Sequence, residues 1–379
     1  MFMNLYKRCL AKLTKQVSIH SFVSELTRKY HKLHVRRELT RAQKQEIQAY
    51  YKQLTGHRVP LIWHKFLYSR TNVYSKQYIP LSLYRTELIG RMNQFWMMEA
   101  YADKNISDLL FPDVTQPKIF VRNMNGYFYA DGKAITREEA ERICSNLEAA
   151  IIKPSMSTRG HGVRKIRVQN GVTDLNGKII GEVFTSYGQD FLVQEVVQQH
   201  EAMSALNPTS ANTIRLLTYR SDMEVILLYA VIRIGQKDQV IDNESSGGIS
   251  ARINLDGTLA KYASGAPGND MVEKTDVGVT LEGYAIPNFD QVVATAKRLH
   301  YRLPYFNLAA WDFAVGKDGE PIFIEWNANP DLSQTAYGPA FGENTERIIR
   351  EAYKKKNSRN EYWKKPKKLT IWKSVPEPI

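Results

Sequence analysis

The sequence predicts an α+β protein in which antiparallel hairpins alternate with short helices, and three observations lead to this prediction. Two apolar segments flank the polar turn 316–319, which is the pattern of a β-hairpin. The dipeptide Asn125-Gly126 is a second hairpin signal. Thr136 stands three residues before Glu139, which is the spacing of a helix capping box. Because 379 residues exceed the usual size of one domain, we expect two or three subdomains.

The net charge of +13 is concentrated at the two ends of the chain. Residues 7–44 hold eleven lysines and arginines among spaced apolar residues and predict a basic helical segment. Residues 354–373 form a lysine-rich tail with Trp363 and Trp372 interleaved. Such ends suit a peripheral contact with an anionic membrane, a polyanionic glycan precursor or nucleic acid. The simpler alternative is a solvated helix and a loose tail, and no zinc-finger or RNA-recognition signature supports specific nucleic-acid binding.

The overall composition is that of a globular protein, with 43% hydrophobic and 24% charged residues. No apolar run is long enough to span a bilayer, and the first residues lack the apolar core of a secretory signal. We therefore expect a cytoplasmic protein, with a peripheral position at the inner face of the membrane as an alternative. Cys9 and Cys144 stand in unrelated contexts, which favours neither a disulfide framework nor a thiolate metal site.

From Val59 onward the pattern predicts short elements. In order, we expect irregular structure and short elements that pack onto the main body over 59–93, a helix over 97–111, and a strand over 118–122 with a hairpin to 127–129. A helix over 136–147 follows, and then strands over 150–153, 163–168, 190–197, 212–219 and 224–233.

The loop between the strands 150–153 and 163–168 is built from small residues. Lys153 precedes it, and Ser157, Gly160 and Gly162 lie within it. Backbone amides freed by small residues can hold phosphate oxygens, and the lysine adds a charge beside them. Because the lysine precedes the loop and a strand follows it, P-loop and Rossmann folds are disfavoured. The alternative is a flexible hairpin tip.

Further polar positions follow along the chain. Glu195 interrupts the apolar strand 190–197 in a way that suits an adenine site, and His200 and Glu201 follow within reach of a ribose. Arg215 and Arg233 on the next two strands are candidate anion binders. The alternative for Arg215 is a surface ion pair. Residues 242–248 form a second polar, glycine-rich turn.

The hairpin 308–327 carries the candidate metal ligands. Glu325 and Asn327 project from one face of its second strand, and antiparallel pairing can bring Asp312 across to meet them. Two carboxylates and an amide oxygen, with positions left for phosphate oxygens and water, are ligands that Mg²⁺ takes in nucleotide enzymes. A merely solvated polar face is the alternative.

The order of these features resembles the ATP-grasp superfamily, and most closely its sugar-transfer-associated group, which is linked to polysaccharide and cell-envelope glycan biosynthesis. The resemblance covers roughly residues 78–350. The segments that show the resemblance are YADKNISDLLF, IIKPSMSTRGHGV, FLVQEVV, NTIRLLTY, NESSGGISARINLDG and AAWDFAVGKDGEPIFIEWNANPD.

The resemblance implies an ATP-grasp fold, in which two α+β subdomains sandwich ATP, and it implies a role for each candidate residue. Lys104 and Lys153 would hold the α- and β-phosphates, and the loop Ser157 to Gly162 would fold over the γ-phosphate. Glu195 and Val197 would hold the adenine, with His200 or Glu201 at the ribose. Asp312, Glu325 and Asn327 would bind Mg²⁺, while Arg215, with Asn212 nearby, and Lys153 would stabilise the transferred phosphate. Lys104, in a common Asp-Lys pair, has a surface charge pair as its alternative.

The implied division of the chain has five parts. They are a basic helical N-terminal extension (1–58), an N-terminal subdomain (59–116), a lid subdomain (117–197), a C-terminal subdomain with the metal site (198–352) and a basic tail (353–379).

The implied function is that of an ATP-dependent ligase. A carboxylate would attack the γ-phosphorus of ATP to give an acyl-phosphate, which an amine or hydroxyl on a sugar or glycan precursor would then displace. Two alternatives remain open: a sugar kinase of the same fold, and a non-catalytic module that binds a polyanionic glycan, nucleic acid or a membrane through its basic ends.

Overall fold

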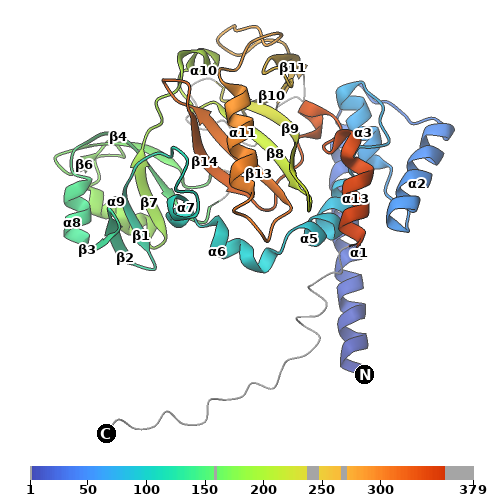
Figure 1. Cartoon of the computed structure of the whole chain (residues 1–379), viewed down its shortest axis with the longest axis horizontal. Helices are drawn as coiled ribbons and strands as arrows, with labels where there is room; N and C mark the ends of the chain where they lie inside the picture. Colours follow the sequence, from blue (N-terminus) through green and yellow to red (C-terminus); the bar gives the residue numbers. More distant parts are fainter. Residues whose placement is uncertain (1, 158–159, 237–246, 266–270, 355–379) are drawn as a thin grey trace.

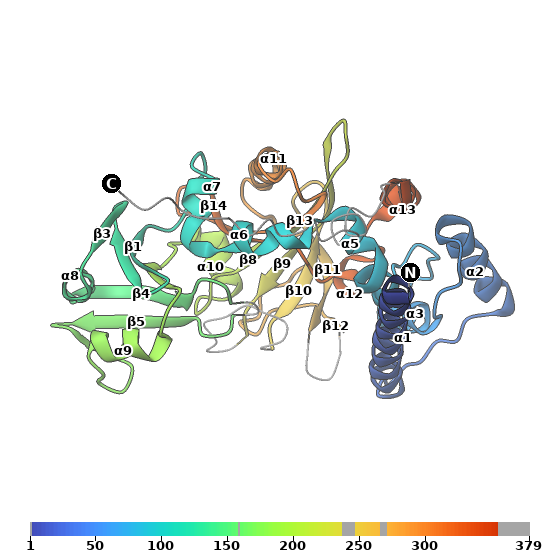
Figure 2. The same cartoon turned by 90° about the horizontal axis from the view of Figure 1, so that it is seen from below.

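The computed structural model describes residues 2–157, 160–236, 247–265 and 271–354, with only the backbone described for 2–13. Two seven-stranded antiparallel sheets lie side by side, and a group of helices lies at the far end of the second sheet (Figures 1 and 2). The strand order is β3-β2-β1-β7-β4-β5-β6 in the first sheet and β12-β11-β10-β9-β8-β13-β14 in the second.

The first sheet buries one face and presents the other to the second sheet. Its elements are β1 (Ile119–Met124), β2 (Tyr127–Ala130), β3 (Lys133–Ile135), β4 (Leu147–Pro154), β5 (Arg164–Gln169), β6 (Val172–Thr173) and β7 (Phe191–Glu195), with helices α8 (Arg137–Ile143) and α9 (Ile180–Tyr187). Ile152 and Val193 pack with Val183 and Phe184 of α9. Because side chains alternate along a strand, Lys153 and Gln194 project from the opposite face.

The second sheet has one face covered by the helix α11 (Phe289–His300) (Figure 1). Its strands are β8 (Thr213–Arg220), β9 (Val225–Ile234), β10 (Ile249–Ile253), β11 (Leu259–Gly265), β12 (Met271–Val272), β13 (Leu308–Val315) and β14 (Pro321–Asn327). On the α11 face, Leu216, Trp311 and Phe313 join Val292 and Leu299 in a hydrophobic core.

Further helices form the group at the far end of the second sheet, and several of them pack on its other face. These are α1 (Phe2–His31), α2 (Arg41–Thr55), α3 (Ile62–Thr71), α4 (Leu81–Leu83), the π-helical turn η1 (Tyr84–Leu88), α5 (Ile89–Met92), α12 (Gln334–Tyr337), η5 (Gly342–Asn344) and α13 (Thr345–Lys354). Ile47 and Tyr51 of α2 belong to the same hydrophobic core as Leu217 and Tyr229 of the sheet. The predicted boundary at residue 58 therefore lies within one hydrophobic core.

The predicted helix over 97–111 is wrong as a single element. The segment contains η2 (Phe95–Met97), α6 (Met98–Ala102), η3 (Lys104–Ile106) and α7 (Ser107–Leu110). The break is at Asp103, which is extended with ψ 117° and whose side chain accepts a hydrogen bond from the Asn105 amide. An aspartate that satisfies a nearby amide in this way competes with the helix. The predicted helix over 136–147 is shorter than expected, because β4 already begins at Leu147.

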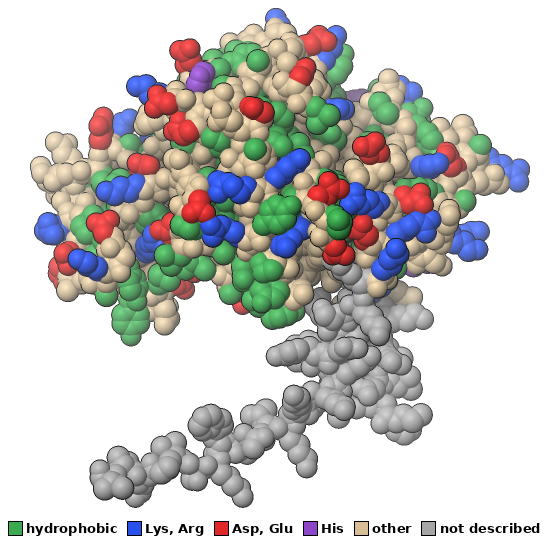
Figure 3. Space-filling view, in the orientation of Figure 1, with side chains coloured by type: hydrophobic (Ala, Val, Ile, Leu, Met, Phe, Trp, Pro, Cys, Tyr) green, Lys and Arg blue, Asp and Glu red, His purple; other side chains and the backbone are tan. Residues whose placement is uncertain are grey.

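Several predictions concern residues outside the described part of the chain. These are the tail beyond Lys354, the side chains before Thr14, and most of the polar turn 242–248. On the described surface, basic and acidic side chains are intermixed over the face shown in Figure 3. No helix among the described residues is long and apolar enough to cross a membrane.

A carboxylate in the π-helical turn joins four parts of the helical group. Glu87 accepts from Lys15 Nζ (2.8 Å), His57 Nε2 (2.9 Å) and the Tyr353 hydroxyl (2.5 Å), which belong to α1, the α2–α3 connection and α13. Its side chain is 9% exposed. Burial raises the pKa of Glu87, but the hydrogen bonds from Lys15, Tyr353 and His57 outweigh it and lower the pKa.

We predict that Glu87→Gln lowers the free energy of unfolding by about 1–3 kcal/mol at pH 7, the usual loss for a buried hydrogen-bonded carboxylate. Because the folded-state pKa lies below the unfolded one, this stabilisation is present above pH 4.5 and is lost as the pH falls through the folded pKa. Urea unfolding at pH 7 and pH 4 measures both effects, with the exposed Glu99→Gln as control. An equal difference between wild type and variant at the two pH values would contradict the prediction.

Candidate active site

The chain crosses between the two sheets twice, and both crossings contact the β13–β14 hairpin. In the first crossing, the Thr115 carbonyl accepts from the Phe323 amide (2.9 Å). In the second, Gln199 forms a bridge to Gly316. The two crossings also contact each other, since the Lys118 amide donates to Glu195 Oε1 (2.8 Å). The exposed face of the first sheet is thereby held opposite β14.

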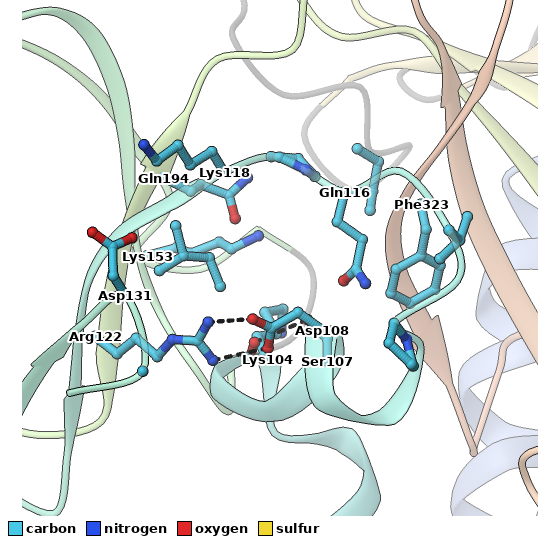
Figure 4. Close-up of a pocket in the computed structure, with 16 residues that line it drawn as sticks. Lys104, Ser107, Asp108, Gln116, Lys118, Arg122, Asp131, Lys153, Gln194 and Phe323 are labelled. Carbon is cyan, nitrogen blue, oxygen red and sulfur yellow. Dashed lines mark hydrogen bonds and ion pairs between the residues drawn. The ribbon is translucent and has the colours of Figure 1, made fainter.

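A cavity of about 400 Å³ lies between the sheets (Figure 4). Its lining includes Lys104, Lys118, Lys153, Gln194, Phe323 and Ile324, which come from the first sheet, the segment before it and β14. The Lys153 side chain extends into the cavity, and an Arg122–Asp108 ion pair lies beside it (Figure 4). A concave site rich in lysine favours an anionic ligand.

Lys153 is the most buried cation of this cavity. It occupies the next-to-last position of β4, and only 7% of it is exposed. Burial and, to a smaller extent, the nearby Lys104 charge lower the pKa of its ammonium group to about 8, while Glu325 opposes the shift. An anion placed next to Lys153 would stabilise the charged ammonium.

Lys104 connects the phosphate-loop candidate to the carboxylates. Its Nζ donates to the carbonyls of Ser157 (2.7 Å) and Ser155 (3.3 Å) and lies 3.5 Å from Glu325 Oε2. The helix break at Asp103 places Lys104 at the start of η3, with its side chain 13% exposed. Lys104 therefore contacts the loop and the second sheet at once, unlike a surface charge pair.

The predicted convergence of carboxylates is confirmed by the register of the hairpin. Asp312 pairs with Glu325 across β13 and β14, and Asn327 pairs with Ala310 one step further along the same face. A β-bulge follows directly after Asp312. The two acids and the amide therefore project from neighbouring positions on the face that α11 does not cover.

Asp312 is buried in a cluster of opposite charge. Arg215 binds it through two hydrogen bonds (Nε to Oδ1, 2.6 Å; Nη2 to Oδ2, 2.5 Å), and Arg233 Nη2 lies 3.5 Å from Oδ1. Burial and the neighbouring Glu325 raise the pKa of Asp312, while Arg215 opposes the shift. Burial also raises the pKa of Glu325, but the charges of Lys104, Arg215 and Lys153 outweigh it and lower the pKa.

Two glycines shape the described ends of the loop after β4. Gly160 and Gly162 have φ of 72° and 74°, in the left-handed region. A Cβ on Gly162 would lie 2.8 Å from Pro154 Cγ, so a larger residue would need the strand end to move. The Tyr187 hydroxyl donates to the Gly162 carbonyl (2.7 Å) and holds this end against α9.

A family model described as sugar-transfer associated ATP-grasp matches residues 83–349, which is more than two thirds of the chain. The chain belongs to this family. The predicted resemblance and the predicted ATP-grasp fold are both confirmed by this match.

Solved structures similar to this ATP-grasp chain are distant in sequence. The biotin carboxylase domain of Hydrogenobacter thermophilus 2-oxoglutarate carboxylase, in complex with MgADP, ADP and bicarbonate, is 15% identical with a TM-score of 0.41 (69% of this chain, 48% of that one). Vibrio cholerae D-alanyl-alanine synthetase A is 12% identical, with a TM-score of 0.41 (68% and 66%). Bacillus anthracis D-alanine–D-alanine ligase, in complex with ATP, is 13% identical, with a TM-score of 0.39 (69% and 67%). The chain thus spans between about half and two thirds of the length of these proteins. The curated proteins gave no match.

The residues of the ATP-grasp metal candidate fit a magnesium ion bound together with a phosphate-bearing ligand. Asp312 and Glu325 supply carboxylate oxygens, and Asn327 supplies an amide oxygen. Asn327 Nδ2 is buried without a hydrogen-bond partner in the described part of the chain. Among the described residues, no three His, Cys, Asp or Glu side chains are grouped to hold a metal by themselves. Remaining coordination positions would come from phosphate oxygens and water, as Mg²⁺ prefers.

The adenine and ribose candidates lie along the second crossing, outside the lining of the cavity. Glu195 Oε1 is occupied by the Lys118 amide. His200 Nδ1 accepts from the Ala202 amide and caps α10 (Glu201–Leu206), whose first residue Glu201 is exposed. Val197 is half-buried between them. Their proposed contacts with a nucleotide stay predictions.

Asn212 is not brought to the cation cluster by its side chain. Its Nδ2 donates to the carbonyls of Met203 (2.7 Å) and Asn207 (2.8 Å), and the residue is fully buried. These bonds hold the end of α10 against the start of β8. Its predicted catalytic role stays a prediction, and the geometry assigns it a structural one.

Sequence reasoning missed an arginine that holds the chain beyond the metal candidates. Arg85 of η1 donates to the Asn329 carbonyl (3.1 Å) and pairs with Asp331. These residues immediately follow Asn327 in the motif EWNANPD. Because Arg85 is more than 240 residues away in sequence, no local spacing could have identified the contact.

Proposed function

We propose that this ATP-grasp protein is an ATP-dependent ligase that activates a carboxylate as an acyl-phosphate and transfers it to an amine or hydroxyl. The observation that carries the proposal is the contact of Lys104 with both the loop after β4 and Glu325, beside the buried Lys153. Lysine ammonium groups and carboxylates thus meet at one site, where a bound metal phosphate would bring an anion to the first and a cation to the second. Magnesium triphosphate supplies both charges.

The residues divide the chemistry between them. Lys104 and Lys153 would neutralise phosphate oxygens, and Arg215 would stabilise charge on the transferred phosphoryl group. Asp312, Glu325 and Asn327 would hold Mg²⁺, which would supply neutralisation of phosphate charge. The opposed sheets would limit access of water to the activated carboxylate. Use of ATP and Mg²⁺ is supported by the family and by the ligands of the solved structures named above.

The acceptor is proposed to be a sugar or a glycan precursor, and the protein would then serve polysaccharide biosynthesis. The support is the family's association with sugar transfer. Product analysis distinguishes this ligase from a kinase of the same fold: a ligase yields an amide or ester with free phosphate, whereas a kinase yields a phosphorylated acceptor.

We predict that Lys153→Met weakens MgATP binding at least tenfold, which corresponds to about 1.4 kcal/mol. The reason is that a buried ammonium beside a phosphate contributes far more than an exposed one. Calorimetric titration of MgATP into wild type and variant measures the change. Lys133→Met, which removes an exposed lysine of β3 in the same sheet, is the matched control and should bind as the wild type does. Failure of the folded wild type to bind MgATP would overturn the proposed function.

A further inference from the structure

The face of the second sheet opposite α11 carries more arginine than the metal candidates require. In register across the strands, Asp312 of β13 pairs with Arg215 of β8, which pairs with Val231 of β9, which pairs with Arg252 of β10. Paired residues in a sheet project to the same side. Arg252 therefore lies on the face of Asp312, three strands away, at about 14 Å between backbones.

Arg252 stacks on an aromatic ring, but one of its hydrogen-bond donors has no partner among the described residues. Its guanidinium lies 4.7 Å from the ring centre of Tyr337 in α12, and the residue is half-buried. Its Nε is buried and has no hydrogen-bond partner among the described residues. A buried donor without a partner is unfavourable, and an acceptor that arrives with a ligand removes that cost.

A second unsatisfied donor lies on the same face, diagonally across from Arg252 on the next strand. Ser264 of β11 pairs with Ser250, which precedes Arg252 by two positions on the same face of β10. Ser264 is 2% exposed, and its Oγ is buried without a hydrogen-bond partner within the described chain. Arginine and a hydroxyl on one face are donors that match the oxygens of a carboxylate or a phosphate.

The charges on this face also favour an anionic ligand. Arg215 and Arg233 both contact Asp312, so this carboxylate has two cations beside it, and the second carboxylate, Glu325, lies 3.5 Å from Lys104. Arg252 adds a further positive charge to the row. A planar guanidinium stacked on an aromatic ring is the side chain that best binds a planar or tetrahedral oxyanion.

We propose that Arg252, stacked on Tyr337 and assisted by Ser264, binds an anionic oxygen group of the substrate that reacts at Asp312 and Glu325. The inference rests on the proposed function and narrows it, because it requires a substrate with a carboxylate or a phosphate at the end remote from the reacting group. Small molecules with a reacting group at one end and an anionic group at the other, such as a sugar phosphate or a sugar acid, match the separation between Asp312 and Arg252.

The test is a set of three calorimetric titrations on the full chain. First, MgATP is titrated to test the nucleotide site. Then inorganic phosphate and, separately, acetate are titrated into protein saturated with the magnesium complex of a non-hydrolysable ATP analogue, which fills the phosphate positions of that site. The proteins are wild type, Arg252→Gln and Arg252→Lys. Arg220→Gln is the matched control, because Arg220 also stacks on a tyrosine (Tyr301, 5.3 Å) but projects from the opposite face of the sheet.

We expect wild type and the control to bind at least one of the two anions, and Arg252→Gln to bind it at least tenfold more weakly. Arg252→Lys should recover part of the loss, since it restores the charge without the planar fork. Preference for phosphate or for acetate identifies the group on the substrate. Unchanged anion binding by Arg252→Gln, or no anion binding by folded wild type, would overturn the inference. If MgATP fails to bind but the anion still requires Arg252 in nucleotide-free protein, the proposed function falls and the anion site stands.

Discussion

Replacement of Glu325 by glutamine is expected to reduce MgATP-dependent turnover at least about 100-fold. Loss of outer partners of a metal site already costs 10–100-fold, and Glu325 is proposed as a direct ligand. The carboxylate also serves as the counter-charge of Lys104, at 3.5 Å, and its charge acts on Lys153. A neutral amide of nearly the same shape removes both roles without opening a cavity. Phosphate release with pooled amino acids and amino sugars, measured over a range of Mg²⁺ concentrations, reports the loss.

The matched control for this variant is Asp318→Asn. Asp318 lies exposed in the turn of the same β13–β14 hairpin and is expected to leave turnover unchanged. Urea unfolding of both variants separates an effect on chemistry from an effect on folding. Turnover of Glu325→Gln within a few-fold of wild type would remove Glu325 from the proposed ligand set.

The largest effect on stability is expected for Arg215→Met. This change leaves Asp312, which is 2% exposed, without its two hydrogen bonds from the guanidinium. Removal of one partner of a buried ion pair costs about 3–5 kcal/mol. Without Arg215, the pKa of Asp312 would rise further above its unfolded value, so the variant regains stability as the pH falls toward that value. Urea unfolding between pH 5 and pH 8 measures the loss and its sign.

A double-mutant cycle with Asp312→Leu tests the cause. Because a buried pair replaced by apolar residues of similar volume is often neutral, the double variant should recover most of the stability lost by Arg215→Met. A coupling energy below about 0.5 kcal/mol would show that the two residues act independently. Arg233 still contacts Asp312 in the Arg215→Met variant, and this contact limits the stability that the variant loses.

The metal candidates were predictable because they depend on local geometry. Turn residues at 316–319 and the period-two alternation fix which side chains of one hairpin face each other, and Asp312 pairs with Glu325 as expected. Lys153 was predictable for a similar reason, since a strand ending in Lys-Pro before a small-residue loop is itself a short-range pattern. The family resemblance added the order of these pieces along the chain.

Contacts between distant segments were beyond the sequence. The helix pattern over 97–111 gave no sign that the Asp103 side chain would satisfy the Asn105 amide and end α6. Arg85 meets Asp331 only because both sheet and helices have folded, and Glu87 gathers partners from α1 and α13 in the same way. For Asn212 the sequence suggested a catalytic role because the residue lies near Arg215, whereas its side chain donates a hydrogen bond to the backbone. The contacts of such residues depend on competition between side chains and on tertiary packing. Neither leaves a periodic pattern in the sequence.

The two crossings are covalent links between the first sheet and the rest of the chain, and both contact the β13–β14 hairpin. Glu195 lies beside them, whereas Pro154 at the end of β4 pairs with Phe191, four residues away along β7. At that strand end the Lys104 ammonium group donates to the Ser155 and Ser157 carbonyls and lies 3.5 Å from Glu325 of the second sheet. Lys104 therefore adds a non-covalent link between the two sheets, away from the crossings. A phosphate oxygen that binds this ammonium group would compete with the two carbonyls, so ligand binding would be coupled to the strength of that link.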